Sequence, residues 1–216
     1  MKPYYSHDGV ELYNCDCAEL LDSTWCDLLV TDPPYGIEYR SNHRTERHAA
    51  IAGDDELPLA KIEAALARTR RAAYVFARWD TVPLMPAPKS LLVWVKNNWS
   101  MGDLEHEHGR QWEAICFYAK PEHEFTKRIP DVLYVDRTDN ALHPTQKPVA
   151  LLRQLIRANV GDVVFDPFAG SGSTLAAAWL EHRKAIGCEI EERYCEVIAT
   201  QLTKLQYGGL FRSAKG

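Results

Sequence analysis

The segment that decides the fold is Val163–Thr174, which reads VVFDPFAGSGST. An apolar run of β-strand character ends in Asp166, a turn with two glycines follows, and an apolar helical pattern begins at Ser173. Gly170 and Gly172 permit backbone angles and a close approach that larger residues would block. The free N–H groups at the start of the helix favour an anionic group. The segment therefore predicts a strand–turn–helix unit that holds part of a cofactor.

An acidic residue follows this turn at an informative distance. The next expected strand ends at Glu189. In nucleotide-binding sheets, an acidic residue about 20 residues beyond such a turn accepts hydrogen bonds from a ribose diol. The turn is not followed by Gly-Lys-Ser/Thr, so a nucleoside triphosphate site is not indicated. A plain tight turn with a solvated glutamate is the alternative, and the pairing of the two features favours a nucleoside-cofactor site.

Short apolar runs alternate with helical patterns along the rest of the chain, which predicts an α/β fold. The expected strands are Glu11–Asn14, Asp27–Thr31, Ala73–Phe76, Leu91–Val95, Glu113–Tyr118, Val163–Asp166 and Ala185–Glu189. The expected helices are Leu59–Arg71, Pro148–Ala158, Ser173–Glu181 and Glu192–Gln206, with cations at the end of the first, Arg68, Arg70 and Arg71. Irregular structure is expected over Gly36–Leu57, Lys96–Trp112 and Pro121–Leu142. The pattern suits one doubly wound sheet of seven strands with helices on both faces.

The composition is that of a globular protein of one domain. Of the 216 residues, 46% are hydrophobic and 25% are charged, which excludes a disordered or collagen-like chain. No run approaches the roughly 20 apolar residues of a membrane helix, and the polar start Met1–Asp8 is not typical of a signal peptide. The formal charge of −5 argues mildly against a nucleic-acid partner. We expect a cytoplasmic protein without a membrane partner.

The six cysteines predict free thiols rather than disulfides or a metal centre. Cys15 and Cys17 have the wrong spacing for a zinc ribbon and lack an obvious second pair. His106 and His108 lie in a glutamate-rich run that is typical of a solvated surface. We expect no metal.

A second constellation begins where the strand Asp27–Thr31 ends in Asp32-Pro33-Pro34-Tyr35. Two consecutive prolines fix the backbone and donate no hydrogen bonds, so the Asp32 carboxylate and the neighbouring carbonyls are rigidly placed acceptors. Tyr35 adds a flat face beside them. This arrangement suits a planar group with an exocyclic amine, such as a flipped-out nucleobase. The alternative is a proline-rich strand end without chemistry.

Attack by such an amine on an electrophile requires acceptors of this kind. The lone pair of adenine's amino nitrogen is delocalised into the ring, which makes it a poor nucleophile. Acceptors that bind its two hydrogens draw the nitrogen toward a tetrahedral shape and stabilise the positive charge that develops on attack. Asp32 and the carbonyl of Pro33 are the candidate acceptors, and Tyr35 is the candidate stacking partner.

Together these pieces resemble the S-adenosylmethionine-dependent amino-methyltransferases of DNA. The resemblance rests on the Asp32–Tyr35 tetrapeptide, the turn Asp166–Gly172, the hexapeptide His143–Pro148 before it and the strand end Tyr13–Ala18. It covers residues 11 to about 205. The catalytic motif precedes the cofactor motif, which is the circularly permuted order of the β class. The resemblance implies a Rossmann-like fold, S-adenosylmethionine as cofactor and double-stranded DNA as partner.

The resemblance also assigns residues and regions. The catalytic residues that it implies are Asp32, Pro33, Pro34 and Tyr35. The cofactor residues that it implies, together with the turn, are Asp16, Cys17, Asp32, His143, Thr145, Gln146, Lys147, Asp166, Phe168, Ala169, Gly170, Ser171, Gly172, Ser173, Thr174, Glu189 and Ile190. Within a single methyltransferase domain, residues 1–120 form the catalytic half, 121–142 a short target-recognition segment, 143–207 the cofactor half and 208–216 a tail. Aspartate before the two prolines favours adenine over cytosine in this family.

Basic residues near the catalytic turn are candidates for DNA contact. Arg40, Arg44 and Arg47 follow the turn directly, and Lys96, Asn97 and Arg110 are weaker candidates. The chain holds little material for recognition, so we expect a short target site, relaxed specificity or a homodimer in which each chain takes part in recognition for the other. Cytosine amino methylation, an RNA substrate and a catalytically silent cofactor- or DNA-binding module stay open as alternatives. The expected setting is a bacterial or phage-encoded protein, in a restriction pair or alone.

Overall fold

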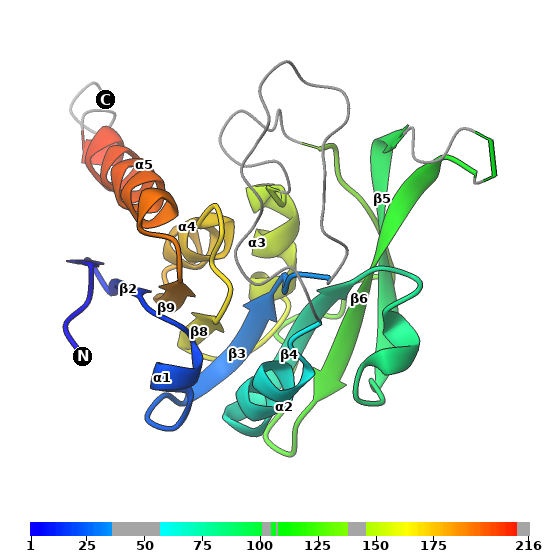
Figure 1. Ribbon diagram of the computed structural model, residues 1–216, viewed down its shortest axis with the longest axis horizontal. Coiled ribbons are helices and arrows are strands. Elements are labelled where there is room, and N and C mark those ends of the chain that lie inside the picture. Colours follow the sequence, from blue (N-terminus) through cyan, green and yellow to red (C-terminus); the bar gives the residue numbers. More distant parts are fainter. Residues whose placement is uncertain (36–56, 101–104, 107, 138–145, 211–216) are drawn as a thin grey trace.

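The computed structural model describes residues 1–35, 57–100, 105–106, 108–137 and 146–210. Its elements in chain order are β1 (Tyr5–His7), β2 (Val10–Asn14), α1 (Ala18–Leu21), β3 (Cys26–Thr31), α2 (Leu59–Ala67), β4 (Thr69–Ala77), the 3-10 turn η1 (Val82–Leu84), β5 (Ser90–Ser100), β6 (Arg110–Ala119), β7 (Val132–Tyr134), α3 (Val149–Arg157), β8 (Val163–Asp166), α4 (Ser173–Leu180), β9 (Lys184–Glu189) and α5 (Glu192–Leu210). The strands form one twisted sheet in the order β1-β2-β9-β8-β3-β4-β6-β5-β7 (Figure 1).

The sheet is mixed and mostly parallel, as the sequence predicts. Strands β2, β9, β8, β3 and β4 are parallel neighbours, whereas β6 is antiparallel to both β4 and β5. All seven expected strands are present. The expected number was too low, because the described residues form nine strands. The two extra strands, β1 and β7, are three residues long and lie at the two edges of the sheet.

Side chains that alternate along the central strands build two cores, one on each face of the sheet. In β3, Leu28 and Val30 belong to one core and Leu29 belongs to the other. Helices α3, α4 and α5 supply their apolar residues to the first core, and α1 and α2 supply theirs to the second. Helices therefore cover both faces (Figure 1), and the predicted doubly wound α/β fold is confirmed.

The predicted helix Leu59–Arg71 is wrong at its C-terminal end. Helix α2 stops at Ala67, and β4 begins two residues later at Thr69. The hydroxyl of Thr69 donates a 2.8 Å hydrogen bond to the carbonyl of Ala65, and Thr69 is the strand partner of Cys26. Arg70 and Arg71 therefore lie in a strand rather than at a helix terminus, and only Arg68 caps the helix.

Two segments expected to be irregular contain regular structure. Strand β5 continues through Lys96 to Ser100, and β6 already begins at Arg110, so the two strands form a long hairpin (Figure 1). Within the segment 121–142, β7 pairs in parallel with β5 through Val132–Tyr134. The described part of the expected recognition segment thus extends the sheet.

The strand order runs outward in opposite directions from β3 and β8, which are adjacent parallel strands. After β3 the chain proceeds through α2 to β4 on one side, and after β8 it proceeds through α4 to β9 on the other. Open α/β sheets bind ligands beside the carboxyl ends of strands at such a switch point. In the described part of the chain, no helix is long and apolar enough to cross a membrane.

Candidate active site

A pocket lies at the carboxyl ends of β2, β9, β8, β3 and β4. Its wall combines the strand ends at Asp16, Asp32 and Glu189 with the glycine turn after Asp166 and the side chain of Phe76. Each of these residues follows or ends a parallel strand, so the topology brings them to one edge of the sheet. The pocket therefore unites both motifs that the sequence singles out.

The glycine turn is held by its own backbone and by β9. The N–H of Ala169 donates a 2.8 Å hydrogen bond to the carbonyl of Cys188, and the N–H of Gly172 donates one of 2.7 Å to the carbonyl of Ala169. Gly170 and Gly172 have φ angles of 51° and 76°, which larger residues adopt only with strain. A Cβ atom on Gly172 would lie 2.7 Å from Cγ2 of Ile198. The turn can therefore reach this geometry only with glycine at this position.

Glu189 lies at the tip of β9 and faces the turn. Its carboxylate accepts hydrogen bonds from the N–H of Gly170 at 2.9 Å and from the N–H of Glu191 at 2.8 Å. Burial outweighs these two donors and raises the pKa of Glu189 to about 7. A ligand that donates hydroxyl hydrogens to this carboxylate would stabilise its charged form. The ribose diol that the sequence predicts is such a ligand.

Asp16 lies just after β2, the strand that is next to β9 in the sheet. Its carboxylate accepts a 2.9 Å hydrogen bond from the N–H of Ala18 and forms a 2.7 Å ion pair with Lys61 of α2. Burial raises the pKa of Asp16, but the Lys61 ammonium and the backbone donor outweigh it, and the net shift is downward. Asp16 is therefore a fixed anionic acceptor, suited to an amine in the pocket.

The ends of the two central strands, β3 and β8, are joined by a hydrogen bond. The hydroxyl of Thr31 donates a 2.7 Å hydrogen bond to Asp166, which also accepts one of 3.1 Å from the N–H of Phe168. Burial raises the pKa of Asp166 to about 6 in spite of these donors. Asp166 therefore joins the catalytic and the cofactor halves and supports the glycine turn, while Asp32 follows directly on Thr31.

The Asp32 carboxylate has a hydrogen-bond donor on each of its two oxygens. The phenol of Tyr35 donates a hydrogen bond to one of its oxygens, and the ammonium of Lys147 donates one to the other. Burial raises the pKa of Tyr35 well above its ordinary value, with the Asp32 charge adding to the effect. Tyr35 therefore keeps its proton and remains a donor. Pro33 and Pro34 also line the pocket, as the tetrapeptide predicts.

Behind Asp32 lies a chain of alternating charges that the sequence analysis did not foresee. Lys147 forms an ion pair with Glu113 of β6 at 3.2 Å, and Glu113 forms another with Lys96 of β5 at 2.6 Å. Burial raises the pKa of Glu113, but the two ammonium groups outweigh it and bring the pKa to about 2. The available signal was weak: Lys96 and Glu113 are charged residues next to apolar strand runs.

Most of the cofactor residues predicted from sequence meet in this pocket. Its wall includes Asp16, Cys17, Asp32, Lys147, Asp166, Phe168, Ala169, Gly170, Ser171, Ser173, Thr174, Glu189 and Ile190. Gln146 and Gly172 are not part of the wall, and Gly172 acts through its packing against Ile198. His143 and Thr145 lie outside the described residues. The wall also contains Lys61, Phe76 and Tyr194, which carry no sequence signal of their own.

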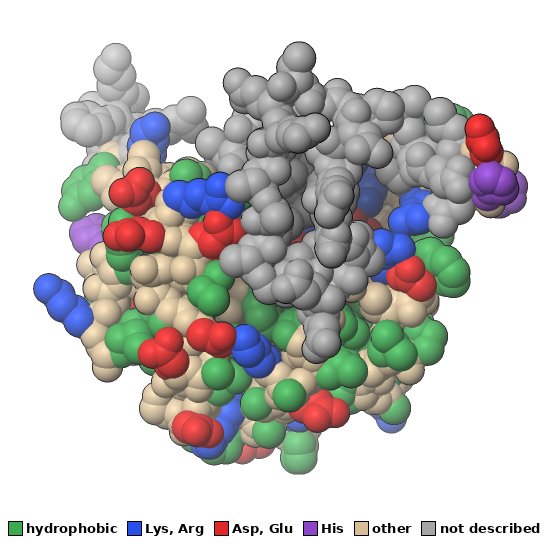
Figure 2. All heavy atoms as spheres, viewed as in Figure 1, with side chains coloured by type: hydrophobic (Ala, Val, Ile, Leu, Met, Phe, Trp, Pro, Cys, Tyr) green, Lys and Arg blue, Asp and Glu red, His purple; other side chains and the backbone are tan. Residues whose placement is uncertain are grey.

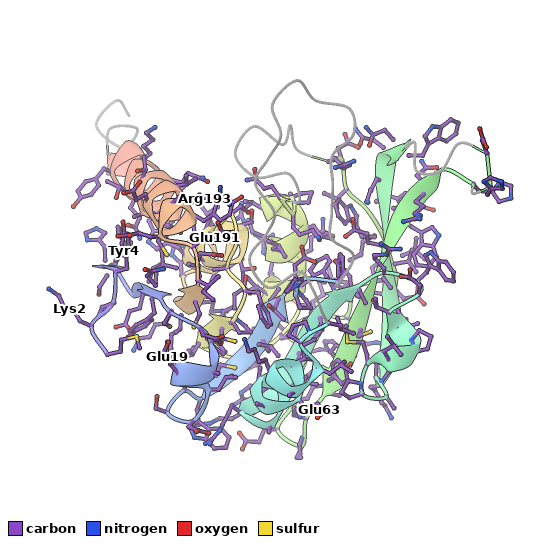
Figure 3. All side chains as sticks on the ribbon, viewed as in Figure 1. Lys2, Tyr4, Glu19, Glu63, Glu191 and Arg193 are labelled. Carbon is purple, nitrogen blue, oxygen red and sulfur yellow. The ribbon has the colours of Figure 1, made fainter. Side chains whose placement is uncertain are left out.

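The rim of the pocket at the start of α5 is charged. Glu191, which lines the pocket, forms an ion pair with Arg193, and Figure 3 labels both side chains. The pair spans the first turn of α5, close to the acceptor that Glu189 provides. This rim therefore offers charge of both signs to a polar ligand.

Only some of the residues predicted to contact DNA lie in the described part of the chain. Arg40, Arg44 and Arg47 lie outside the described residues. Asn97 is exposed on β5, and Arg110 begins β6 at the same edge of the sheet as the pocket. Lys96 is different, because its ammonium is held by Glu113 in the interior. Among the described residues on the face seen in Figure 2, Lys and Arg side chains are scattered between acidic ones without a continuous basic surface.

Comparisons with known proteins identify the family of this chain. A family model described as DNA methylase, N6_N4_Mtase, matches residues 91–201. A protein of Escherichia coli (strain K12) whose name describes it as a methylase, YubD, is 34% identical over an alignment of 195 positions, which covers 83% of each chain. The chain belongs to the N6/N4 DNA methylase family. It is therefore a DNA methyltransferase, and the cofactor of this family is S-adenosylmethionine.

Further relatives extend the likeness. The DNA adenine methyltransferase YhdJ of Escherichia coli (strain K12) is 51% identical over an alignment of 105 positions, which covers 44% of this chain and 35% of YhdJ. The fold is similar to the crystal structure of the M1.HpyAVI–SAM complex, with a TM-score of 0.68 and 21% identity over 89% of this chain and 99% of that one. It is also similar to the cytosine-N4-specific PvuII DNA methyltransferase, with a TM-score of 0.66 and 19% identity over 92% and 88% of the chains.

The residues of the pocket fit S-adenosylmethionine. The cofactor offers an adenine amine, a ribose diol and a charged amino-acid end, and the pocket offers Asp16, Glu189 and the polar turn Ser171–Thr174. The raised pKa of Glu189 marks an acceptor that lacks sufficient donors, which a diol would supply. Among the described residues, no group of three or more His, Cys, Asp or Glu side chains is arranged to hold a metal ion.

Proposed function

We propose that this methyltransferase acts on the exocyclic N6 amino group of adenine, in a short target sequence of double-stranded DNA, after the base has flipped out of the helix. One observation carries the proposal: the Asp32 carboxylate and the Tyr35 ring line the same pocket as Glu189 and the glycine turn. Asp32, which can accept hydrogen bonds from an amine, and Tyr35, whose ring can stack on a base, thus lie next to the cofactor residues. Bound S-adenosylmethionine supplies an electrophilic methyl group on its sulfonium.

The residues of this chain act on the amine. Asp32 and the carbonyl of Pro33 accept the two amino hydrogens, which localises the nitrogen lone pair and stabilises the positive charge that forms. Pro33 and Pro34 hold these acceptors rigid, so that little reorganisation is needed during the reaction. Tyr35 stacks on the base, and Phe76 closes the apolar side of the pocket. The amine proton leaves to solvent or through Asp32.

Adenine rather than cytosine is proposed because aspartate before the two prolines favours adenine in this family. The tetrapeptide begins with aspartate, and the relative that is 51% identical over its matched part is named as an adenine methyltransferase. Cytosine N4 is the second candidate, because the PvuII enzyme has a similar fold and is specific for cytosine N4. Both bases present an exocyclic amine beside a ring nitrogen, so the same pocket chemistry serves either.

Binding of DNA is proposed to depend on a local basic strip. The whole chain carries a formal charge of −5, so contacts with phosphates must come from a cluster such as Arg40, Arg44 and Arg47, with Asn97 and Arg110 as further candidates. Binding of this kind is weak and salt-sensitive. A homodimer would bring two such strips to one DNA duplex, and light scattering at working concentration tests whether the protein is one.

The experiment that tests the proposal identifies the methylated base. Duplex DNA and structured RNA compete for labelled methyl from S-adenosylmethionine, and the product is digested to nucleosides and weighed. N6-methyladenine from DNA supports the proposal. N4-methylcytosine, or a label found mainly in RNA, would overturn it, and no product with the wild type but intact cofactor binding would indicate a catalytically silent module.

A further inference from the structure

We propose that Lys147 is a positioning residue that keeps the catalytic carboxylate of Asp32 ionised and correctly oriented, and that Glu113 and Lys96 hold Lys147 in place. The inference rests on the proposed function, because it assumes that the Asp32 carboxylate acts on the amine. It assigns to Lys147 a task other than the cofactor contact that the sequence suggests.

The four residues form one continuous chain of alternating charge, Lys96–Glu113–Lys147–Asp32. They come from four separate parts of the fold: β5, β6, the entry to α3 and the end of β3. The Lys96–Glu113 contact is 2.6 Å and the Glu113–Lys147 contact is 3.2 Å. Lys147 then donates a hydrogen bond to Asp32. The exposed fraction of the Lys147 side chain is 7%, so its ammonium is placed by protein partners and not by water.

Aromatic rings fix the ammonium further. The Lys147 nitrogen lies 5.2 Å from the ring centre of Phe76 and 5.9 Å from that of Tyr35. Distances below about 6 Å favour a cation–π contact. An ammonium between two rings and two carboxylates has little freedom to turn toward another ligand. This geometry assigns Lys147 to Asp32 and Glu113.

The charged groups that face Asp32 shift its pKa in opposite directions. Burial favours the neutral acid and raises the pKa of Asp32, Lys147 opposes this effect, and Glu113 adds to it. The other groups nearby are the Tyr35 phenol, which donates to Asp32, and the carboxyl of Asp166 on β8. Arg78 acts on the Tyr35 side. Removal of Lys147 should therefore raise the pKa of Asp32, and removal of the Glu113 charge should lower it.

The test is the pH profile of single-turnover methyl transfer at saturating S-adenosylmethionine. The rate falls at low pH because Asp32 becomes protonated. The low-pH side of the profile, called the acid limb here, therefore reports the pKa of Asp32. Lys147→Met should move that limb up by about 1 to 3 pH units, which is the usual effect of one opposite charge at this distance. Glu113→Gln removes the like charge that faces Asp32 but keeps a side-chain oxygen that can accept a hydrogen bond from Lys147, so it should move the limb down. Lys147→Arg should restore the wild-type position at least in part.

Matched controls exclude a general effect of lost ion pairs. Arg157 of α3 and Glu181 form an ion pair at 2.6 Å, away from the pocket. Arg157→Gln and Glu181→Gln should leave the acid limb in place. If Lys147→Met does not fold, Glu113→Gln decides the question alone, and an unmoved or raised limb would overturn the inference.

The outcomes separate this inference from the function on which it rests. Asp32→Asn tests the function: if that variant methylates at the wild-type rate, the proposed role of Asp32 is wrong. If Asp32→Asn is inactive but Lys147→Met and Glu113→Gln leave the limb unmoved, only the positioning role is wrong. A higher KM for S-adenosylmethionine in Lys147→Met without a shift of the limb would assign Lys147 to the cofactor instead.

Discussion

The backbone N–H of Gly170 donates a 2.9 Å hydrogen bond to the carboxylate of Glu189. This bond joins the glycine turn after β8 to the tip of β9, which are the two features that the sequence pairs as a cofactor site. It fixes one oxygen of Glu189 and aims the carboxylate into the pocket. The position of the turn and the position of the acid are therefore set by each other.

Cofactor affinity should depend on this carboxylate. Glu189→Gln keeps the size of the side chain but removes the charge that we propose accepts the hydrogens of the cofactor's ribose diol. Because a hydrogen bond to a charged group contributes about 1.5–3 kcal/mol, we expect S-adenosylmethionine to bind roughly tenfold or more weakly. Equilibrium dialysis measures the effect, with Glu192→Gln on the exposed start of α5 as the control. An equal loss of affinity for S-adenosylmethionine in both variants would show that Glu189 does not contact the cofactor.

The stability of the protein without cofactor should fall as pH rises, with a contribution from Glu189. The unfolded chain ionises this group near its ordinary pKa of 4.5, but the folded chain does so only near 7. Between these values the folded state holds a proton that the unfolded state has lost, so each rise in pH favours unfolding. The full contribution is present below pH 4.5 and is lost by pH 7, and it amounts to roughly 3 kcal/mol at most.

Urea unfolding between pH 5 and pH 8 tests this effect. The decrease in the free energy of unfolding should be smaller in Glu189→Gln than in the wild type. Asp166, whose pKa is about 6, adds a decrease of the same sign in both proteins. An identical pH dependence of the two proteins would contradict the assignment.

Gly172 should be intolerant of a side chain for two separate reasons. Its φ of 76° costs an L-residue about 1–2 kcal/mol, and a Cβ would meet the buried side chain of Ile198 at 2.7 Å. Gly9 has a similar φ of 79°, but there a Cβ would meet Lys184 at an ordinary 3.6 Å. Urea unfolding should therefore show a larger loss of stability for Gly172→Ala than for Gly9→Ala. Equal losses would mean that the clash is relieved and only the backbone term acts.

Tyr35 should act mainly through its ring. Tyr35→Phe retains the stacking face and removes only the hydroxyl that donates to Asp32. Because Lys147 still donates to the other oxygen of Asp32, we expect Tyr35→Phe to lose less rate than Tyr35→Ala, which lacks both the ring and the hydroxyl. Tyr35→Ala removes the face, and base–aromatic stacking is worth about 1–3 kcal/mol, which corresponds to a loss of roughly 10- to 100-fold. Single-turnover rates measure both. Equal rates in the two variants would contradict stacking.

The sequence was sufficient for the parts of the fold that have local signals. The strand Val163–Asp166 was predicted with its correct bounds because an apolar run ends at a turn with fixed glycine requirements. Strands β1 and β7 were missed because three-residue strands are defined by their partners, such as Leu12 for Tyr5 and Val93 for Val132. The end of α2 was placed too late because the pairing of Thr69 with Cys26 overrides local helix preference.

The candidate site divides in the same way. Asp32, Glu189 and the turn were found because each lies within a short motif of fixed spacing. The chain Lys96–Glu113–Lys147 was missed because its members are far apart in the sequence and meet only when β5, β6 and the entry to α3 pack together. Lys61 escaped for the same reason, since its partner Asp16 lies 45 residues away. Such ion pairs depend on the tertiary fold and leave no pattern that a motif could reveal.

The proposed role of the Asp32 carboxylate is to activate the amino group of adenine. Its most direct test compares the wild type with Asp32→Asn by single-turnover methyl transfer to duplex DNA, followed by mass analysis of the nucleosides. We predict N6-methyladenine from the wild type and at least a hundredfold slower transfer by Asp32→Asn, the scale of a lost preorganised contact, about 10²–10³, with unchanged binding of S-adenosylmethionine. Wild-type rates in Asp32→Asn, or N4-methylcytosine as the product, would contradict the account.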